Sequence, residues 1–218
     1  MLDRFMRHLV DPALERAGRR LADRGVGADA LTVAGLGIGL AAALCVALRL
    51  DLMALALFIT NRVLDGLDGA VARASVRTDR GGFLDIVLDF AVYGAVPLAF
   101  AFRDPGPNAA PAAVLLFAFY VNGATFLAFA AVAAKRGLKN AAWADKSIYF
   151  TAGLAEGTET ILFFSAMILW PAWFPVLAHA FAGLTLLSAL ARVALAWRVF
   201  RDNGENERWR FRPGRPYL

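Results

Sequence analysis

The chain has 218 residues, of which 59% are hydrophobic, and its mean hydropathy of +0.55 is high for a soluble domain, where about half of the residues are apolar. The apolar residues lie in blocks of about 20, the length of helix that crosses a bilayer, which favours an integral membrane protein over a soluble globular one. The net charge of +5 therefore indicates membrane orientation and contact with anionic lipid, not a nucleic-acid partner.

The first segment, residues 1–29, has the pattern of an amphipathic helix. Leu2, Phe5 and Leu9 follow helical spacing, and six arginines lie among the apolar positions of the segment. This pattern predicts a helix that lies at the cytoplasmic membrane interface and that Pro12 can break. The segment lacks the continuous apolar run of a signal peptide.

Six apolar blocks follow, and they must be helical because backbone groups in lipid have no other hydrogen-bond partners. The predicted fold is an all-α integral membrane protein with six transmembrane helices. These form one domain over residues 30–200, followed by a basic cytoplasmic tail at 201–218. The predicted spans are residues 30–49, 52–73, 81–102, 110–134, 147–170 and 173–198.

The distribution of positive charge predicts the orientation of these spans. An even number of spans puts both termini on one side, and the loops and ends on that side carry nineteen Lys and Arg residues. The loops on the opposite side carry only Arg49 and Arg103. The positive-inside rule therefore places both termini in the cytoplasm.

Four aspartates lie where the second predicted span ends and the third begins: Asp65, Asp68, Asp85 and Asp89. Spacings of three and four residues keep each pair on one helix face. The two helices are antiparallel neighbours that rise about 1.5 Å per residue. Asp68 is therefore expected level with Asp85, and Asp65 level with Asp89, in the cytoplasmic third of the membrane.

Four carboxylates at one depth repel one another, and divalent cations relieve that repulsion. Mg²⁺ prefers carboxylate oxygens and completes its shell with water and substrate phosphates, and a pair of such ions can clamp a phosphoryl group during displacement. The alternative is that the aspartates are protonated and serve helix contacts. The presence of four acids at matched depth disfavours this alternative. Gly66 and Gly69 indicate close approach of a ligand or another backbone.

This stretch resembles the signature of the CDP-alcohol phosphatidyltransferases, and every fixed position is present: Asp65-x2-Asp68-Gly69-x2-Ala72-Arg73-x7-Gly81-x3-Asp85-x3-Asp89. The whole chain is similar to bacterial inner-membrane members of that family. The resemblance implies an enzyme that displaces CMP from CDP-diacylglycerol with the hydroxyl of a small alcohol. It also implies dependence on Mg²⁺ or Mn²⁺, with two ions in the site, and a homodimer in the bacterial inner membrane.

The resemblance further implies a role for each signature residue. Asp65, Asp68 and Asp85 are expected to bind metal. Asp89 completes the metal site and acts as general base toward the acceptor hydroxyl. The residues expected to line or support the CDP site are Asp65, Asp68, Gly69, Ala72, Arg73 and Gly81.

The acceptor alcohol is less well determined. Members that make phosphatidylglycerophosphate follow the last aspartate with lysine, whereas this chain has Phe90, and LDIVLDFAVYGAVP is similar to phosphatidylserine synthases. Glycerol 3-phosphate and serine are both retained as acceptors. Four cations are candidate acceptor ligands, with topology and lipid contact as the alternative role of the lysines: Arg192, Lys135, Lys139 and Lys146.

A second set of charges is predicted near the middle of the membrane. Glu156 and Glu159 stand one helical turn apart, and Arg62 is expected at similar depth. The preferred interpretation is an ion pair between Arg62 and one of the glutamates, and the alternative is recognition of a cationic acceptor group.

Two other classes of protein are alternatives to the transferase. A cation transporter would use intramembrane acids as its pathway, but it would not explain Arg73 and Gly81 at the family spacing. A pseudoenzyme or scaffold is disfavoured because no signature residue is missing.

Overall fold

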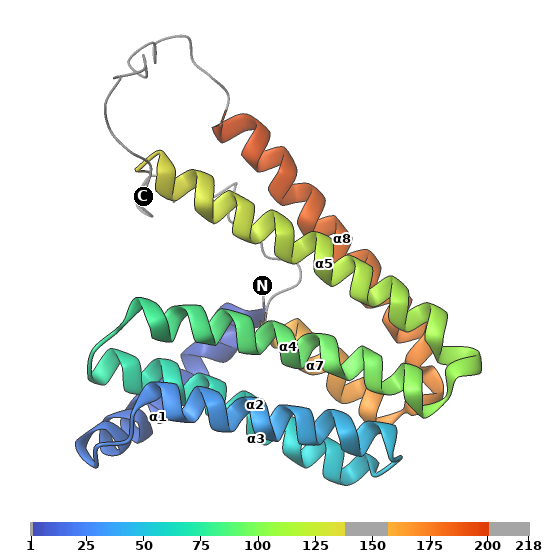
Figure 1. Ribbon diagram of the computed structural model, residues 1–218, viewed down its shortest axis with the longest axis horizontal. Helices are drawn as coiled ribbons and strands as arrows, with labels where there is room; N and C mark the ends of the chain where they lie inside the picture. Colours follow the sequence, from blue (N-terminus) through green and yellow to red (C-terminus); the bar gives the residue numbers. More distant parts are fainter. Residues whose placement is uncertain (1, 138–156, 201–218) are drawn as a thin grey trace.

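The computed structural model describes residues 2–137 and 157–200, and within them the chain forms only helices, so the predicted all-α class is confirmed (Figure 1). The elements in chain order are α1 (Leu2–Asp23), α2 (Ala28–Ala47), α3 (Asp51–Ala74), α4 (Asp79–Arg103), α5 (Pro105–Lys135), α7 (Gly157–Leu169), the 3-10 turn η2 (Pro171–Trp173) and α8 (Phe174–Val199).

Four helical segments are long and apolar enough to cross a membrane: Ala28–Ala47, Asp79–Arg103, Pro105–Lys135 and Pro171–Val199. Helix α3 has sufficient length, with 24 residues, but it carries Arg62 and the first aspartate pair. The described part of α7 has 13 residues, and the first part of the predicted fifth span lies outside the described residues. The structure thus supports four spans directly, and the count of six stays a prediction.

Helix α5 begins at Pro105, earlier than the predicted start at residue 110. Proline is favoured in the first turn of a helix, because its missing N–H would have no intrahelical acceptor there and its φ is already helical. The apolar pattern alone therefore underestimates the length of this helix.

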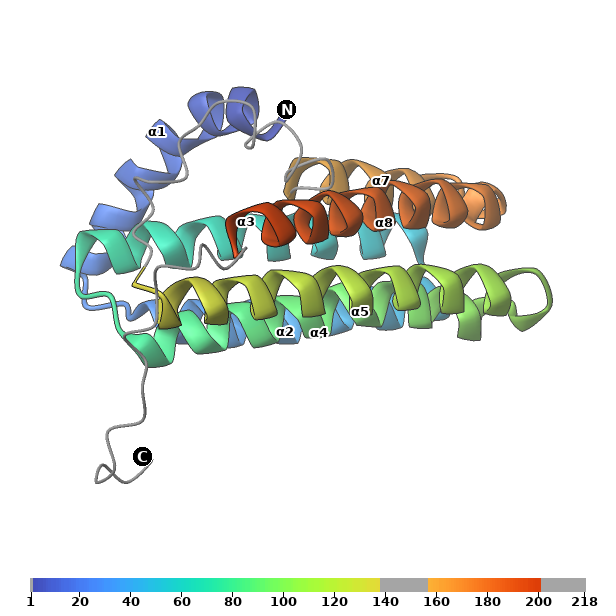
Figure 2. The ribbon, with the colours of Figure 1, turned by 90° about the horizontal axis from the view of Figure 1, so that it is seen from above.

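Helix α1 packs across the outer side of α3, with α2 and α4 on the other side of α3 (Figure 2). It is continuous through Pro12, so a break at that residue is not observed. The two helices approach closely where Gly18 faces Ala70, since a Cβ on Gly18 would lie 2.6 Å from the Ala70 Cβ. A Cβ on Gly66 would meet the Leu14 side chain at 2.7 Å, so Gly66 serves this packing and not a ligand.

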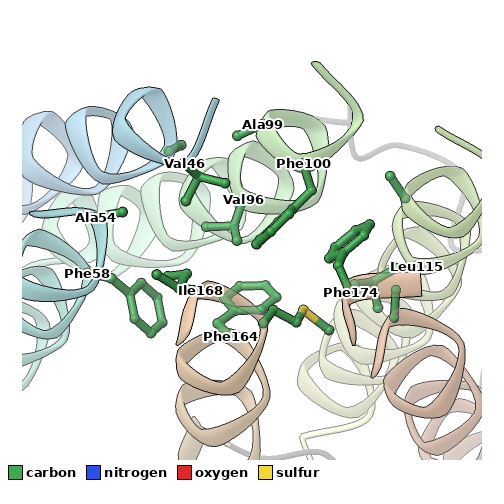
Figure 3. Close-up of a cluster of buried hydrophobic side chains, with 14 of the residues drawn as sticks. Val46, Ala54, Phe58, Val96, Ala99, Phe100, Leu115, Phe164, Ile168 and Phe174 are labelled. Atoms are coloured by element: carbon green, nitrogen blue, oxygen red, sulfur yellow. The ribbon is translucent and has the colours of Figure 1, made fainter. Parts of the chain in front are cut away.

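The apolar core gathers side chains from α2, α3, α4, α5, α7 and α8 (Figure 3). Phe58 of α3 packs edge-to-face against Phe164 of α7, with ring centroids 5.7 Å apart. Phe100 near the end of α4 stacks on Phe174 at the start of α8, at 4.2 Å. These aromatic contacts hold α3, α4, α7 and α8 together at one end.

Helices α5 and α8 run side by side and diverge from α4 toward Lys135 and Val199 (Figure 1). A polar contact joins the two helices from the middle of α5 to the last third of α8, where Nη1 of Arg192 donates to Oδ1 of Asn122 and to Oγ1 of Thr125, each at 2.9 Å. The α5–α8 pair is thus tied together separately from the α2–α3–α4 group.

We predict that Gly18→Ala lowers the free energy of unfolding by about 1–3 kcal/mol, because the added Cβ would overlap Ala70 and push α1 off α3. Thermal unfolding of the purified protein in detergent measures this loss. Gly37→Ala is the matched control, since no heavy atom lies within 4 Å of its added Cβ. Equal stability of the two variants would contradict the close α1–α3 packing.

Candidate active site

The connection between α3 and α4 sets the geometry of the site. Helix α3 ends at Ala74, and α4 begins at Asp79 with Thr78 as its N-cap, whose hydroxyl oxygen accepts a hydrogen bond from the Gly81 N–H at 3.0 Å. The short connection reverses the chain, and both helices pack on α2, so that the aspartates of α3 lie opposite those of α4.

Three of the four predicted aspartates form a compact set of oxygens. Asp65, Asp68 and Asp85 each offer a carboxylate oxygen, and these oxygens all lie within 4.8 Å of one another. Asp68 is 5% exposed, and its Oδ2 accepts a hydrogen bond from the Thr32 hydroxyl of α2 at 2.7 Å. The all-oxygen donor set and its spacing fit a hard divalent cation such as Mg²⁺ or Mn²⁺.

The fourth aspartate, Asp89, lines the same small cavity as the other three but pairs with an arginine. Its Oδ1 lies 2.7 Å from Nη1 of Arg62, and the same nitrogen lies 3.8 Å from Oδ2 of Asp65. The structure therefore brings all four carboxylates together, as predicted, and adds one buried cation to them.

This pairing corrects the predicted ion pair between Arg62 and a glutamate. Among the described residues Arg62 pairs with Asp89 and Asp65, and not with Glu159 of α7. Glu156 lies outside the described residues. The prediction failed because it used only the depth of each residue in the membrane, and depth does not determine the face of the helix on which a side chain lies. Arg62 lies three residues before Asp65 and therefore on the same face of α3, the one directed toward α4.

A second cavity of about 310 Å³ adjoins the acidic one, and Thr32, Asp68 and Asp85 line both. Its lining includes all but one of the residues expected at the CDP site: Asp68, Gly69, Ala72, Arg73 and Gly81. Asp65, the exception, lines the acidic cavity instead. The family spacing thus corresponds to one continuous surface that runs from the carboxylates to the α3–α4 connection.

The signature glycines at this cavity have different surroundings from Gly66. An added Cβ at Gly69 would meet only the mobile end of Arg73, with Nη1 at 3.3 Å, so its face is open to the cavity. An added Cβ at Gly81 would lie 3.0 Å from Oδ1 of Asp29 and 3.1 Å from Oγ1 of Thr78. Glycine at residue 81 therefore lets the starts of α2 and α4 come together.

Two side chains of the site were not predicted. Thr32 fixes Asp68, and Asp29 accepts hydrogen bonds from Arg80 at 3.0 and 2.6 Å across the rim of the larger cavity. Both come from the start of α2, and their contacts depend on how α2 packs against α3 and α4, which the sequence pattern does not predict.

The predicted acceptor cations are not gathered at the carboxylates. Arg192 bonds to α5 through Asn122 and Thr125, and Lys135 is the last residue of α5. Neither side chain lines the two cavities described above. Lys139 and Lys146 lie outside the described residues.

Comparison with known proteins identifies the family of the chain. Residues 26–200 match the sequence model of the family described as CDP-alcohol phosphatidyltransferase. The chain belongs to the CDP-alcohol phosphatidyltransferase family. The match covers every signature residue and all helices from α2 to α8, so the predicted family is confirmed.

Two curated proteins are similar in sequence to this CDP-alcohol phosphatidyltransferase. The inner membrane protein YnjF of Escherichia coli (strain K12) is 47% identical over 193 residues, which cover 88% of this chain and 94% of that protein. The archaetidylinositol phosphate synthase of Pyrococcus horikoshii is 38% identical over 85 residues, which cover 38% of this chain and 45% of that protein.

A solved structure shares the fold of this CDP-alcohol phosphatidyltransferase. The phosphatidylinositol phosphate synthase PgsA1 of Mycobacterium tuberculosis, crystallised with CDP-DAG bound, superimposes with a TM-score of 0.65 at 20% sequence identity. The alignment covers 84% of this chain and 93% of that one.

We predict that Thr32→Val weakens Mg²⁺ binding by about tenfold, because outer hydrogen-bond partners orient the carboxylates that bind a metal. Isothermal titration of the detergent-solubilised protein with MgCl₂ measures the change. Thr60→Val is the matched control, since its hydroxyl bonds only the Ala56 carbonyl of its own helix. An unchanged affinity in Thr32→Val would show that the hydrogen bond to Asp68 does not support metal binding.

Proposed function

We propose that the protein transfers the phosphatidyl group of CDP-diacylglycerol to the hydroxyl of a small polar alcohol and releases CMP. The observation that carries this proposal is the arrangement of the two cavities. A compact set of carboxylate oxygens from Asp65, Asp68 and Asp85 adjoins a cavity of about 310 Å³ that is lined by the signature residues Gly69, Ala72, Arg73 and Gly81. A nucleotide in the larger cavity would present its pyrophosphate to the carboxylates.

We assign Asp65, Asp68 and Asp85 as metal ligands, with Asp89 completing the site. These residues would hold Mg²⁺ or Mn²⁺, as two ions, which would neutralise the pyrophosphate and stabilise the departing CMP phosphate. The protein's own contribution is to hold these oxygens on two rigid helices, with Thr32 fixing Asp68. Helix-borne ligands keep their spacing better than ligands on loops.

We assign the other signature residues to the nucleotide and the acceptor. Arg73 binds a phosphate oxygen of CDP, and Gly69 and Ala72 let the nucleotide approach the α3 backbone. Asp89 accepts the proton of the acceptor hydroxyl while the oxygen of that hydroxyl attacks the phosphorus bonded to the lipid. The proton moves to the Asp89 carboxylate, the new P–O bond forms, and the bond to CMP breaks.

The acceptor is a small alcohol that carries charge. Glycerol 3-phosphate and serine remain candidates from the sequence, and two relatives add a third. The Pyrococcus protein is named an archaetidylinositol phosphate synthase, and the structural neighbour is a phosphatidylinositol phosphate synthase. These names support testing a phosphorylated inositol as well.

We further propose six membrane spans with both termini in the cytoplasm. Helix α3 joins two apolar helices, α2 and α4, that both have the length to cross, so α3 must return the chain across the membrane. Helix α8 starts beside the far end of α4, where Phe174 stacks on Phe100, whereas α5 ends on the opposite side, so the chain crosses again between them. A homodimer in the bacterial inner membrane is proposed from the family resemblance and the Escherichia coli relative.

We predict that the purified protein releases CMP from CDP-diacylglycerol with one acceptor of a panel and that EDTA abolishes the release. The panel contains glycerol 3-phosphate, serine and inositol phosphate, and CMP is measured by chromatography. A parallel assay in liposomes measures cation flux. Cation flux in liposomes, together with no CMP release in the presence of any acceptor, would reject the transferase proposal in favour of a transporter.

We predict that Asp89→Asn lowers kcat by about 10²–10⁴-fold, because an amide cannot accept the acceptor proton. The elution profile of the variant in size-exclusion chromatography should match that of the unchanged protein. Asp79→Asn is the control, since Asp79 is exposed in the first turn of α4 and lines neither cavity. A wild-type rate in Asp89→Asn would remove the base assignment.

A further inference from the structure

A buried arginine shares the acidic cavity with the four aspartates, and no signature position accounts for it. Arg62 lies on α3, three residues before Asp65, and its side chain is only 6% exposed. An arginine in a membrane helix is costly and usually extends toward the water at the membrane surface. Arg62 instead turns into the bundle and ends among the carboxylates.

The guanidinium of Arg62 is held by neutral groups on two sides. Oδ1 of Asn61 accepts from its Nε at 2.8 Å and from its Nη2 at 2.6 Å, and Asn61 is itself 3% exposed and donates to the Gly35 carbonyl of α2 at 2.9 Å. Nη1 donates to the Tyr93 hydroxyl at 3.0 Å, and the Tyr93 ring centroid lies 5.0 Å from Cζ. These contacts fix the position of the charge before any ligand binds.

The remaining contacts of Arg62 are with the acids. Nη1 donates to Oδ1 of Asp89 at 2.7 Å and lies 3.8 Å from Oδ2 of Asp65. The bond to Oδ1 leaves Oδ2 of Asp89 as the oxygen to meet metal or acceptor hydroxyl. The three helices α2, α3 and α4 thus place one permanent positive charge beside four negative ones.

We propose that Arg62 is a resident cation of the acidic site, a positioning residue that orients Asp89 and lowers the affinity of the carboxylates for a divalent cation. Its attraction offsets part of the repulsion among the aspartates and fixes which oxygen Asp89 presents. The same charge repels a bound metal ion. This inference rests on the proposed metal site and is independent of the identity of the acceptor.

The two effects of Arg62 have opposite signs, and a purely structural residue would not produce that combination. Removing the charge should tighten metal binding, because a unit charge close to a divalent ion in a wet site costs on the order of 1.4 kcal/mol, a factor of about ten. Removing the hydrogen bond to Asp89 should slow the reaction, since misplacing a reacting group costs about 10²-fold.

The test is Arg62→Gln, titrated with Mg²⁺ in detergent without CDP-diacylglycerol and then assayed for CMP release. We expect Mg²⁺ to bind about tenfold more tightly than to the unchanged protein. We expect kcat to fall about 100-fold while KM for CDP-diacylglycerol stays the same, because Arg62 does not line the larger cavity. Mg²⁺ affinity that is unchanged or weaker in Arg62→Gln overturns the proposal.

Two further variants separate charge from structure. Arg103→Gln removes another largely buried arginine, which bonds to Asp51 at the far end of α4, and it should leave Mg²⁺ affinity unchanged. Arg62→Lys keeps the charge but cannot make both bonds to Asn61, so it should bind Mg²⁺ as the unchanged protein does while kcat stays low. If Arg62→Gln does not fold, tighter Mg²⁺ binding by Arg62→Lys overturns the proposal.

These measurements also distinguish the failure of this inference from the failure of the proposed function. Absence of CMP release by the unchanged protein with every acceptor would reject the transferase, while the Mg²⁺ titrations would still decide the role of Arg62. Absence of Mg²⁺ binding to the unchanged protein would reject both the metal site and the role of Arg62 in it.

Discussion

The repulsion among four carboxylates inside a helical bundle is the constraint on which the rest of this structure depends. Bringing them together needs two helices in strict antiparallel register, and the four-residue connection from Ser75 to Thr78 provides that register. Tolerating them needs compensating partners, and the structure supplies two of them, the Thr32 hydroxyl and the Arg62 guanidinium. The apolar core lies at the opposite end, where it stabilises the bundle without competing for space.

The apolar half and the polar half of the bundle therefore have different roles. Aromatic contacts such as that of Phe58 with Phe164 lie in the apolar core and involve no residue that lines the two cavities. The polar half is held by directional contacts that determine geometry more than they add stability. A rigid apolar end combined with a polar end of fixed geometry suits a reaction in which the acyl chains stay in lipid and the nucleotide arrives from water.

Much of this arrangement follows from the sequence alone. The bounds of α2, α3 and α4 fall within two residues of the predicted spans, because lipid length and hydropathy limit where a helix can start and end. The convergence of the aspartates follows from the rise per residue along two antiparallel helices. The partner of Arg62 and the contacts of Asp29 did not follow, because they depend on helix rotation and on packing between segments far apart in the chain.

The ion pairs that Arg62 and Arg80 form with Asp89 and Asp29 differ in their exposure to solvent. The Arg62–Asp89 pair is enclosed by helices, whereas the Arg80 side chain is 80% exposed where it bonds to Asp29 at the rim. Dissolved ions screen an exposed pair strongly and an enclosed one weakly. The rim of the larger cavity should therefore loosen as ionic strength rises while the carboxylate cluster keeps its shape, so of these two regions the rim is the one that responds to salt.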